Sequence, residues 1–166
     1  MIESKAYKMY LNTFIYYILL MALRKLPKYY PDGFLYRSIT KVVELENPYK
    51  KKYVPYKIGN VKTFWGFTST SINPKKSYDF LEKYKIDQEQ NCLHYKRGTV
   101  FSLSGNLWGY DIAVLSYYEK EEEILLEPER KYTIEEIFPN VNDIITIRGK
   151  MKDTPIVLGD INKKMN

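Results

Sequence analysis

Apolar positions divide the chain into a helical beginning and a strand-rich remainder. From Leu11 to Leu26, apolar side chains recur at i, i+3, i+4 and i+7 spacing, which predicts an amphipathic helix packed on the core. Its apolar run, FIYYILLMAL at 14–23, has roughly half the length that a membrane-spanning helix needs. Lys5 and Lys8 precede it as in a signal peptide, but no small-x-small cleavage site follows. We therefore expect a core helix, with a targeting role as the weaker alternative.

Beyond this helix, β-branched and aromatic residues gather in short runs between turns. The predicted strands cover residues 34–39, 61–71, the region around 99–101, 112–115, 124–126, 132–134 and 144–147. We also expect a short helix at 77–84, a loop at 105–111 and a partly ordered tail from residue 149. One helix followed mostly by strands predicts a single α+β domain with a largely antiparallel sheet over residues 1–166.

Charge is spread unevenly over this domain. The net charge is +6, but residues 1–60 hold 11 Lys/Arg against 4 Asp/Glu, and residues 61–166 hold 15 against 16. A basic first part predicts a positive face for an anionic partner, which could be a nucleotide, a nucleic acid or a membrane surface. Tyrosine alternates with lysine in YKKKYVPYK at 49–57, as on surfaces that bind single-stranded nucleic acid. A solvated basic loop is the favoured interpretation of that segment.

Several kinds of site are excluded by composition. Cys92 and His94 are the only cysteine and the only histidine, so neither a disulfide framework nor a Cys/His zinc site can form. A cysteine-nucleophile dyad of these two residues is a minor alternative. The sequence has no G-x-G-x-x-G after a strand and no G-x-x-x-x-G-K-[ST], which excludes both standard backbone cradles for phosphate.

Three other motifs carry candidate chemistry. Arg37 lies inside the predicted strand LYRSI, where it needs an anionic partner: either an internal carboxylate or a bound phosphate. The motif FTSTS at 67–71 offers hydroxyls on both faces of a strand, which are common there and can also orient a carboxylate or a ribose. The acidic run in SYYEKEEEILLEP at 116–128 leads directly into a predicted buried strand.

The two-residue period of a strand gives this acidic run a direction. If the strand is already extended at Glu121, then Glu121 and Glu123 point to one face, and Glu122 points outward to the other. Two carboxylates on one face repel each other and titrate as a pair. Such pairs serve in acid/base sites and in sites that stabilise a cation.

Taken together and in this order, the three motifs resemble those of the arginine–serine–glutamate type of mono-ADP-ribosyltransferases, which includes C2-like and C3-like toxins and arginine-specific enzymes. The resemblance covers about residues 10–135 and rests on LYRSI, FTSTS and YEKEEEILLEP. It implies two packed, mostly antiparallel β-sheets around an NAD cleft, with flanking helices. It also implies NAD as substrate and no metal.

The resemblance assigns roles to single residues. Arg37 is expected to bind the phosphates of NAD, together with Ser38. Ser69 is expected to hydrogen-bond Glu123, while Thr70 and Ser71 support the strand and the ribose. Glu123 would contact the 2′-hydroxyl of the nicotinamide ribose and stabilise its cationic centre. Glu121 would orient the incoming nucleophile, and an acidic residue here resembles the arginine-modifying members. Tyr118 would contact the acceptor protein.

These expectations lead to one preferred function and two alternatives. The preferred function is transfer of ADP-ribose from NAD to a protein arginine, with release of nicotinamide. The alternatives are an NAD glycohydrolase on the same fold and a non-enzymatic module that binds nucleic acid or protein through residues 47–59. We expect a monomer with no stable nucleic-acid or membrane partner. A cytoplasmic location is the default expectation, and secretion or delivery into another cell stays open.

Overall fold

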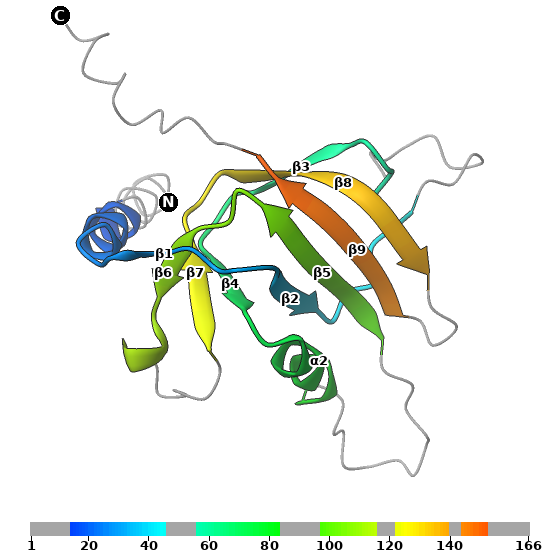
Figure 1. The fold of residues 1–166 in the computed structure, drawn as a ribbon, viewed down its shortest axis with the longest axis horizontal. Helices are drawn as coiled ribbons and strands as arrows, with labels where there is room; N and C mark the ends of the chain where they lie inside the picture. Colours follow the sequence, from blue (N-terminus) through cyan, green and yellow to red (C-terminus); the bar gives the residue numbers. More distant parts are fainter. Residues whose placement is uncertain (1–13, 46–55, 84–96, 116–121, 140–143, 153–166) are drawn as a thin grey trace, which may run out of the picture.

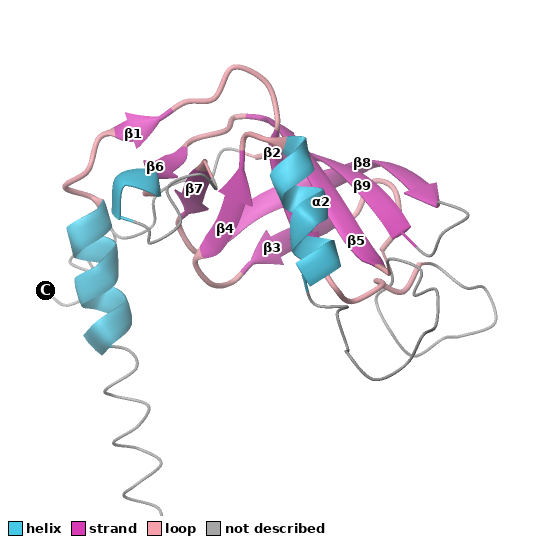
Figure 2. Ribbon diagram, turned by 90° about the horizontal axis from the view of Figure 1, so that it is seen from below, coloured by secondary structure: helices cyan, strands magenta, loops and turns pink. Residues whose placement is uncertain are grey.

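A computed structural model describes five stretches of the chain, residues 14–45, 56–83, 97–115, 122–139 and 144–152. They form a nine-stranded sheet, with helix α2 (Pro74–Lys83) across one face and the helical residues 14–23 at one side (Figures 1 and 2). The α+β class expected from the sequence is confirmed.

The sheet is almost entirely antiparallel. Its strands are β1 (Lys28–Tyr29), β2 (Leu35–Ile39), β3 (Val61–Phe64), β4 (Thr68–Ser71), β5 (Gly98–Gly105), β6 (Gly109–Asp111), β7 (Glu123–Leu126), β8 (Arg130–Pro139) and β9 (Ile144–Met151). Their order across the sheet is β1-β6-β7-β4-β2-β5-β9-β8-β3. Only β5 and β9 pair in parallel among these neighbours.

The main core lies on one face of the sheet, where alternate residues of the long strands are apolar. Its buried members are Leu35, Val43, Phe101, Leu103, Leu107, Ile124, Leu126, Tyr132, Ile134, Ile145, Ile147 and Met151. Tyr132 stacks on Phe64, with ring centroids 4.8 Å apart. Its ring also fills the space beside Gly149, where an added Cβ would lie 2.7 Å from the ring. A larger residue at position 149 would therefore displace the central aromatic ring of the core.

A seam between β2 and β4 divides the sheet into two halves. The register between these strands is confined to one pair, Tyr36 with Ser71. On one side of the seam lie β1, β6, β7 and β4, and on the other lie β2, β5, β9, β8 and β3. The resemblance predicted two sheets. In the structure they correspond to the two halves of one nine-stranded sheet, which a single residue pair joins. The strands separate beyond the single pair, and this separation creates the space for a site.

Two predictions for residues 61–71 and 77–84 need correction. Residues 61–71 were expected to form one strand, but they form β3, which pairs with β8, and β4, which pairs with β7 and β2. Residues 65–67 lie between them and carry the chain from one half of the sheet to the other. Helix α2 begins at Pro74, three residues earlier than expected, because proline suits the first position of a helix.

Three further boundaries differ from the sequence prediction. Part of the expected loop at 105–111 is strand β6, which pairs with β1 and β7. The expected strand at 112–115 is wrong: Ala113–Leu115 forms a 3-10 helix, which begins where the Asp111 side chain accepts a hydrogen bond from the Ala113 amide, 3.0 Å long. Strand β9 continues to Met151, past the expected start of the tail.

The prediction of a core-packed first helix is wrong for the described residues. Leu20 and Leu23 are buried, each about 5% exposed. Seven other large apolar side chains of this helix are 38–61% exposed: Phe14, Ile15, Tyr16, Tyr17, Ile18, Leu19 and Met21. Periodicity predicts which side chains share a face, but it does not say whether the protein covers that face.

Candidate active site

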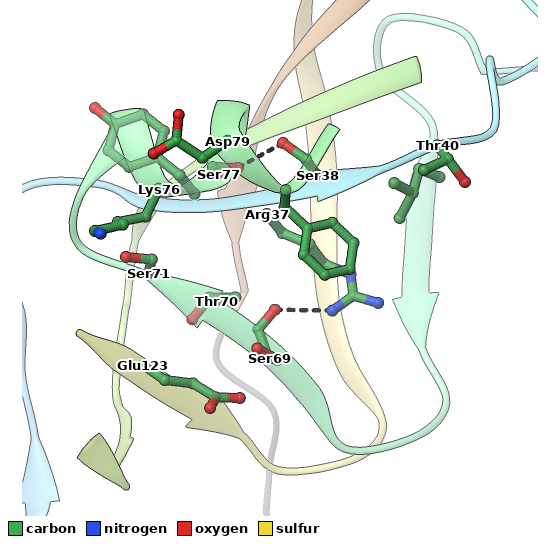
Figure 3. Close-up of a pocket in the computed structure, with 13 residues that line it drawn as sticks. Arg37, Ser38, Thr40, Ser69, Thr70, Ser71, Lys76, Ser77, Asp79 and Glu123 are labelled. Atoms are coloured by element: carbon green, nitrogen blue, oxygen red, sulfur yellow. Dashed lines mark hydrogen bonds between the residues drawn. The ribbon is translucent and has the colours of Figure 1, made fainter. Parts of the chain in front are cut away.

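A pocket of about 550 Å³ opens at the seam between β2 and β4. Its walls come from β2, β4, the start of β7 and helix α2 (Figure 3). It is lined by Tyr36, Arg37, Ser38, Ile39, Thr40, Ser69, Thr70, Ser71, Lys76, Ser77, Asp79, Phe80 and Glu123. The structure therefore brings together all the described residues to which the sequence assigned a role.

Arg37 crosses the seam at the point where the strands separate. Its Nη1 donates a hydrogen bond of 2.8 Å to the backbone carbonyl of Ser69 on β4 (Figure 3). A side chain thus satisfies a carbonyl that the interrupted ladder leaves without a backbone partner. Burial lowers the pKa of the Arg37 guanidinium from its usual value, although Tyr132 acts in the opposite direction. Guanidinium groups stay charged in proteins, so a half-buried cation faces this pocket.

No carboxylate pairs with Arg37 among the described residues. Arg37 donates a single hydrogen bond within this part of the chain, to an uncharged carbonyl. A guanidinium offers five N–H groups in a planar fork that suits phosphate and carboxylate oxygens. Of the two partners considered from sequence, the described structure lacks the internal carboxylate and leaves room for a bound anion.

The hydroxyls of β4 are divided between structure and pocket. Thr70 is buried, and its Oγ1 donates a 2.6 Å hydrogen bond to the backbone carbonyl of Ile124 on β7. The Oγ of Ser71 accepts a hydrogen bond of 3.1 Å from the amide of Asn73, which starts the turn into α2. Ser69 is exposed at the pocket. The motif thus fixes β4 to both neighbouring elements and leaves one hydroxyl exposed.

Glu123 is the first residue of β7, and its carboxylate extends toward Ser69 in Figure 3. In the ladder it lies opposite Ser71, whereas Ser69 lies opposite Leu125. Ser69 and Glu123 are therefore diagonal neighbours on one face of the β4–β7 pair. No hydrogen bond joins these two described residues in this structure, so the expected contact between them stays a prediction.

The reasoning that placed Glu121 and Glu123 on one strand face is wrong at Glu122. Glu122 has a φ of 49°, which is left-handed and interrupts the two-residue alternation, and the strand begins only at Glu123. Glu122 itself is exposed, as expected. Glu121 and Tyr118 lie outside the described residues, as do Cys92, His94 and most of the basic segment 47–59. Their predicted roles stay predictions.

Sequence reasoning missed the contribution of α2 to the pocket. Lys76, Ser77, Asp79 and Phe80 line one wall. The Oγ atoms of Ser77 and Ser38 lie 2.6 Å apart in a buried hydrogen bond that fastens the helix to β2. The hydroxyl of Ser38, expected to bind the cofactor, is therefore already engaged. The signal in the sequence was Asn73-Pro74, since the Asn73 side chain accepts a 3.0 Å bond from the Lys75 amide and caps the helix.

A second arginine forms a closed ion pair at the other end of β7. Nε and Nη2 of Arg24 each donate a 3.1 Å hydrogen bond to the carboxylate of Glu127, and the hydroxyl of Tyr110 adds one of 2.7 Å. Burial raises the pKa of Glu127, but the hydrogen bonds from Arg24 and Tyr110 outweigh it and leave the pKa below its usual value. This cluster fastens the end of the first helix to the strand that carries Glu123.

The pocket chemistry suits an organic anion. No group of three His, Cys, Asp or Glu side chains that could hold a metal ion occurs in the described part of the chain. The pocket combines two cations, Arg37 and Lys76, with hydroxyls and the carboxylates of Asp79 and Glu123, and its volume is within the range of small-molecule sites. These groups fit a dinucleotide, because phosphates need cationic donors and ribose hydroxyls need acceptors.

Comparison with solved structures places this arrangement among known folds. No family model matches the sequence, and no curated protein matches it. The structure resembles the Vis toxin, an ADP-ribosyltransferase from Vibrio splendidus, with 29% identity over 82% of this chain and 55% of the other, and a TM-score of 0.53. Vis in complex with agmatine matches with 28% identity, 82% and 56% coverage, and a TM-score of 0.55.

A more distant likeness is to exoenzyme S from Pseudomonas aeruginosa, in complex with human 14-3-3 protein beta and bound to carba-NAD. Identity is 15% over 84% of this chain and 57% of the other, and the TM-score is 0.50. The chain has the fold of an ADP-ribosyltransferase. It spans about 55% of the length of the Vis structures.

Proposed function

We propose that this protein is a mono-ADP-ribosyltransferase that transfers ADP-ribose from NAD to an arginine side chain. The observation that carries the proposal is the pocket at the seam, which Arg37, Ser69 and Glu123 line together and where no carboxylate of the described residues pairs with Arg37. The 28–29% identity with Vis over most of this chain supports NAD as the substrate. Exoenzyme S is only 15% identical to this chain, so its likeness supports the fold alone and not the ligand.

Arg37 binds the pyrophosphate of NAD in this proposal. The guanidinium is half-buried, so an anion binds it without competition from bulk water on every side. Its planar donors match two phosphate oxygens at once, which a lysine would not do. The hydrogen bond to the Ser69 carbonyl fixes the guanidinium before the ligand arrives, and this lowers the entropy cost of binding.

Glu123 stabilises the charge that develops when the glycosidic bond breaks. Nicotinamide leaves with the bonding electron pair and becomes neutral, and positive charge develops on C1′ of the ribose. The Glu123 carboxylate lies at the pocket edge on a paired strand, where it accepts a hydrogen bond from the 2′-hydroxyl and opposes that charge. Thr70 keeps this part of β7 in place through its bond to the Ile124 carbonyl.

An arginine acceptor is supported by two observations. Vis is bound to agmatine, whose guanidinium group is the group that an arginine presents. This chain has Glu121 two residues before Glu123. A guanidinium nitrogen must lose a proton when it bonds to C1′, and a carboxylate can orient it and accept that proton. Glu121 has this role in the proposal.

The test is incubation of the protein with NAD and agmatine, with nicotinamide and ADP-ribosyl-agmatine measured separately. The wild type should release nicotinamide and form ADP-ribosyl-agmatine in matching amounts. Glu121→Gln should lose most of the transfer and keep NAD hydrolysis, because it changes the residue that orients the acceptor and leaves Arg37 and Glu123 unchanged.

Two results would redirect the proposal. Nicotinamide release without any modified agmatine or protein would identify an NAD glycohydrolase. Absence of NAD turnover, with salt-dependent nucleic-acid binding that is lost when Lys50, Lys51 and Lys52 are neutralised, would identify a binding module instead.

A further inference from the structure

The first helix presents apolar side chains to solvent as well as to the protein. Leu20 and Leu23 are buried against the rest of the protein. With a period of 3.6 residues, Phe14, Ile18 and Met21 lie on the opposite side, and all three are exposed. Ile15 lies on the flank of this face beside Ile18 and is exposed as well. A helix at a protein surface ordinarily carries polar residues there, so this face needs an apolar partner.

The C-terminal end of this helix is followed by positive charge and by aromatic residues of the kind found at membrane interfaces. Lys25 and Lys28 follow it directly and are exposed. The Nζ of Lys28 lies 4.0 Å from the ring centre of Trp108, and Tyr30 is also exposed. Lysine next to tryptophan and tyrosine is the combination found at the level of lipid headgroups. The first 60 residues supply the net positive charge of the chain, and residues 61–166 are close to neutral.

We propose that this helix and the basic residues after it bind the surface of an anionic lipid bilayer. The apolar face enters the boundary between headgroups and acyl chains, while Lys25 and Lys28 contact anionic headgroups. In this proposal the helix lies in the plane of the surface. No helix in the described ranges is long and apolar enough to cross a bilayer.

The position of the helix keeps the pocket accessible in this arrangement. In both views the helix lies beside β1 and β6, away from α2 (Figures 1 and 2). None of the residues that line the pocket belongs to the helix. The protein would thus act on targets near a membrane while bound to it. The proposal departs from the expectation of no membrane partner, because that expectation assumed that the core covers the helix.

The test is sedimentation of the full chain with vesicles of phosphatidylcholine alone and with about 30% phosphatidylserine added. The protein should sediment with the anionic vesicles only, and raising the salt concentration should release it. The double variant Ile15→Gln/Ile18→Gln should lower the bound fraction about tenfold or more, because it removes two exposed apolar side chains. Lys25→Gln/Lys28→Gln should lower affinity by a similar factor.

A matched control changes exposed apolar residues elsewhere. Ile58→Gln/Val61→Gln alters two side chains of comparable exposure near β3, at the far edge of the sheet, and should leave vesicle binding unchanged. Failure of the wild type to bind either vesicle would overturn the proposal. So would a dimer in gel filtration that Ile15→Gln/Ile18→Gln converts to a monomer, since a second copy would then cover the helix. NAD turnover without lipid is independent of these results.

Discussion

The two ends of strand β7 present the same pair of charged groups in opposite states. At one end, Glu127 is bound by Arg24 and by Tyr110, with every contact at 3.1 Å or less. At the other end, Glu123 and Arg37 both line the pocket and do not pair with each other. Arginine and glutamate alone therefore do not identify a site.

The surroundings of each arginine explain the difference. The hydrogen bond to Glu127 raises the pKa of Arg24, whereas burial lowers the pKa of Arg37, which donates a hydrogen bond to the uncharged carbonyl of Ser69. One cation has its counter-charge inside the protein, and the other has none among the described residues. We interpret the Arg24 end as a structural junction and the Arg37 end as a site that a ligand completes.

The largest expected effect is on catalysis at the pocket end of β7, where Glu123 lies. Glu123→Gln should reduce nicotinamide release from NAD by about 10²–10³-fold, because an amide does not oppose the charge on the ribose. Stability in urea should change little, since Glu123 is half-exposed and has no ion pair in the described chain. The control is Glu129→Gln, an exposed residue outside the pocket, which should keep full activity. Equal turnover by wild type and Glu123→Gln would contradict the assigned role.

The two arginines should differ next in their effect on stability. Arg24→Met should lower the free energy of unfolding by about 3 kcal/mol, because it leaves the buried Glu127 without its cation. Arg37→Met should lower it by less than about 1 kcal/mol, since it removes one hydrogen bond and also a desolvated charge. Urea denaturation at pH 7 measures both. A larger loss for Arg37→Met would show that Arg37 is the structural residue.

Acid should weaken the ion pair between Arg24 and Glu127. The folded-state pKa of Glu127 is below its usual value, so its contribution to stability is present above about pH 4.3 and is lost as pH falls through the folded-state pKa. Glu127→Gln should therefore cost about 2 kcal/mol at pH 7. This difference from the wild type should shrink below about pH 4, and thermal unfolding across pH measures it. A constant difference would mean that the carboxylate charge does not matter.

The smallest effect concerns the bond between β4 and β7. Thr70→Val keeps the shape of the side chain and removes its hydrogen bond to the Ile124 carbonyl, so stability should fall by about 1 kcal/mol. Thr70→Ser keeps the hydroxyl and is the matched control. If Thr70 also positions Glu123, then Thr70→Val should lower kcat for nicotinamide release while KM for NAD changes little. Unchanged kcat would limit Thr70 to a structural role.

Local patterns predicted the residues of the pocket but not all of its walls. Arg37 in LYRSI and Glu123 before ILL stand out because charged residues border apolar strands, and both line the pocket. The division of residues 61–71 into β3 and β4 was not predictable, because strand propensity does not specify which neighbour a strand pairs with. Lys76 and Phe80 line the pocket because α2 packs beside the seam, and the local sequence does not predict that packing.

Contacts between distant residues explain the remaining differences. Arg24 and Glu127 are 103 positions apart, and nothing in either local segment predicts their ion pair. The exposure of the first helix likewise depends on what the rest of the molecule covers, whereas its apolar periodicity is a local property. The left-handed conformation of Glu122 was not predictable, because a run of glutamates does not favour any particular turn type.

Calorimetric titration of NAD into matched variants tests the central claim most directly. The wild type should bind NAD, and Arg37→Met should weaken binding by about 10–100-fold through loss of the phosphate contacts. Glu127→Gln, which opens the ion pair at the other end of β7, should keep wild-type affinity under conditions where it is fully folded. Equal affinity of wild type and Arg37→Met, or loss of affinity in Glu127→Gln alone, would contradict the account.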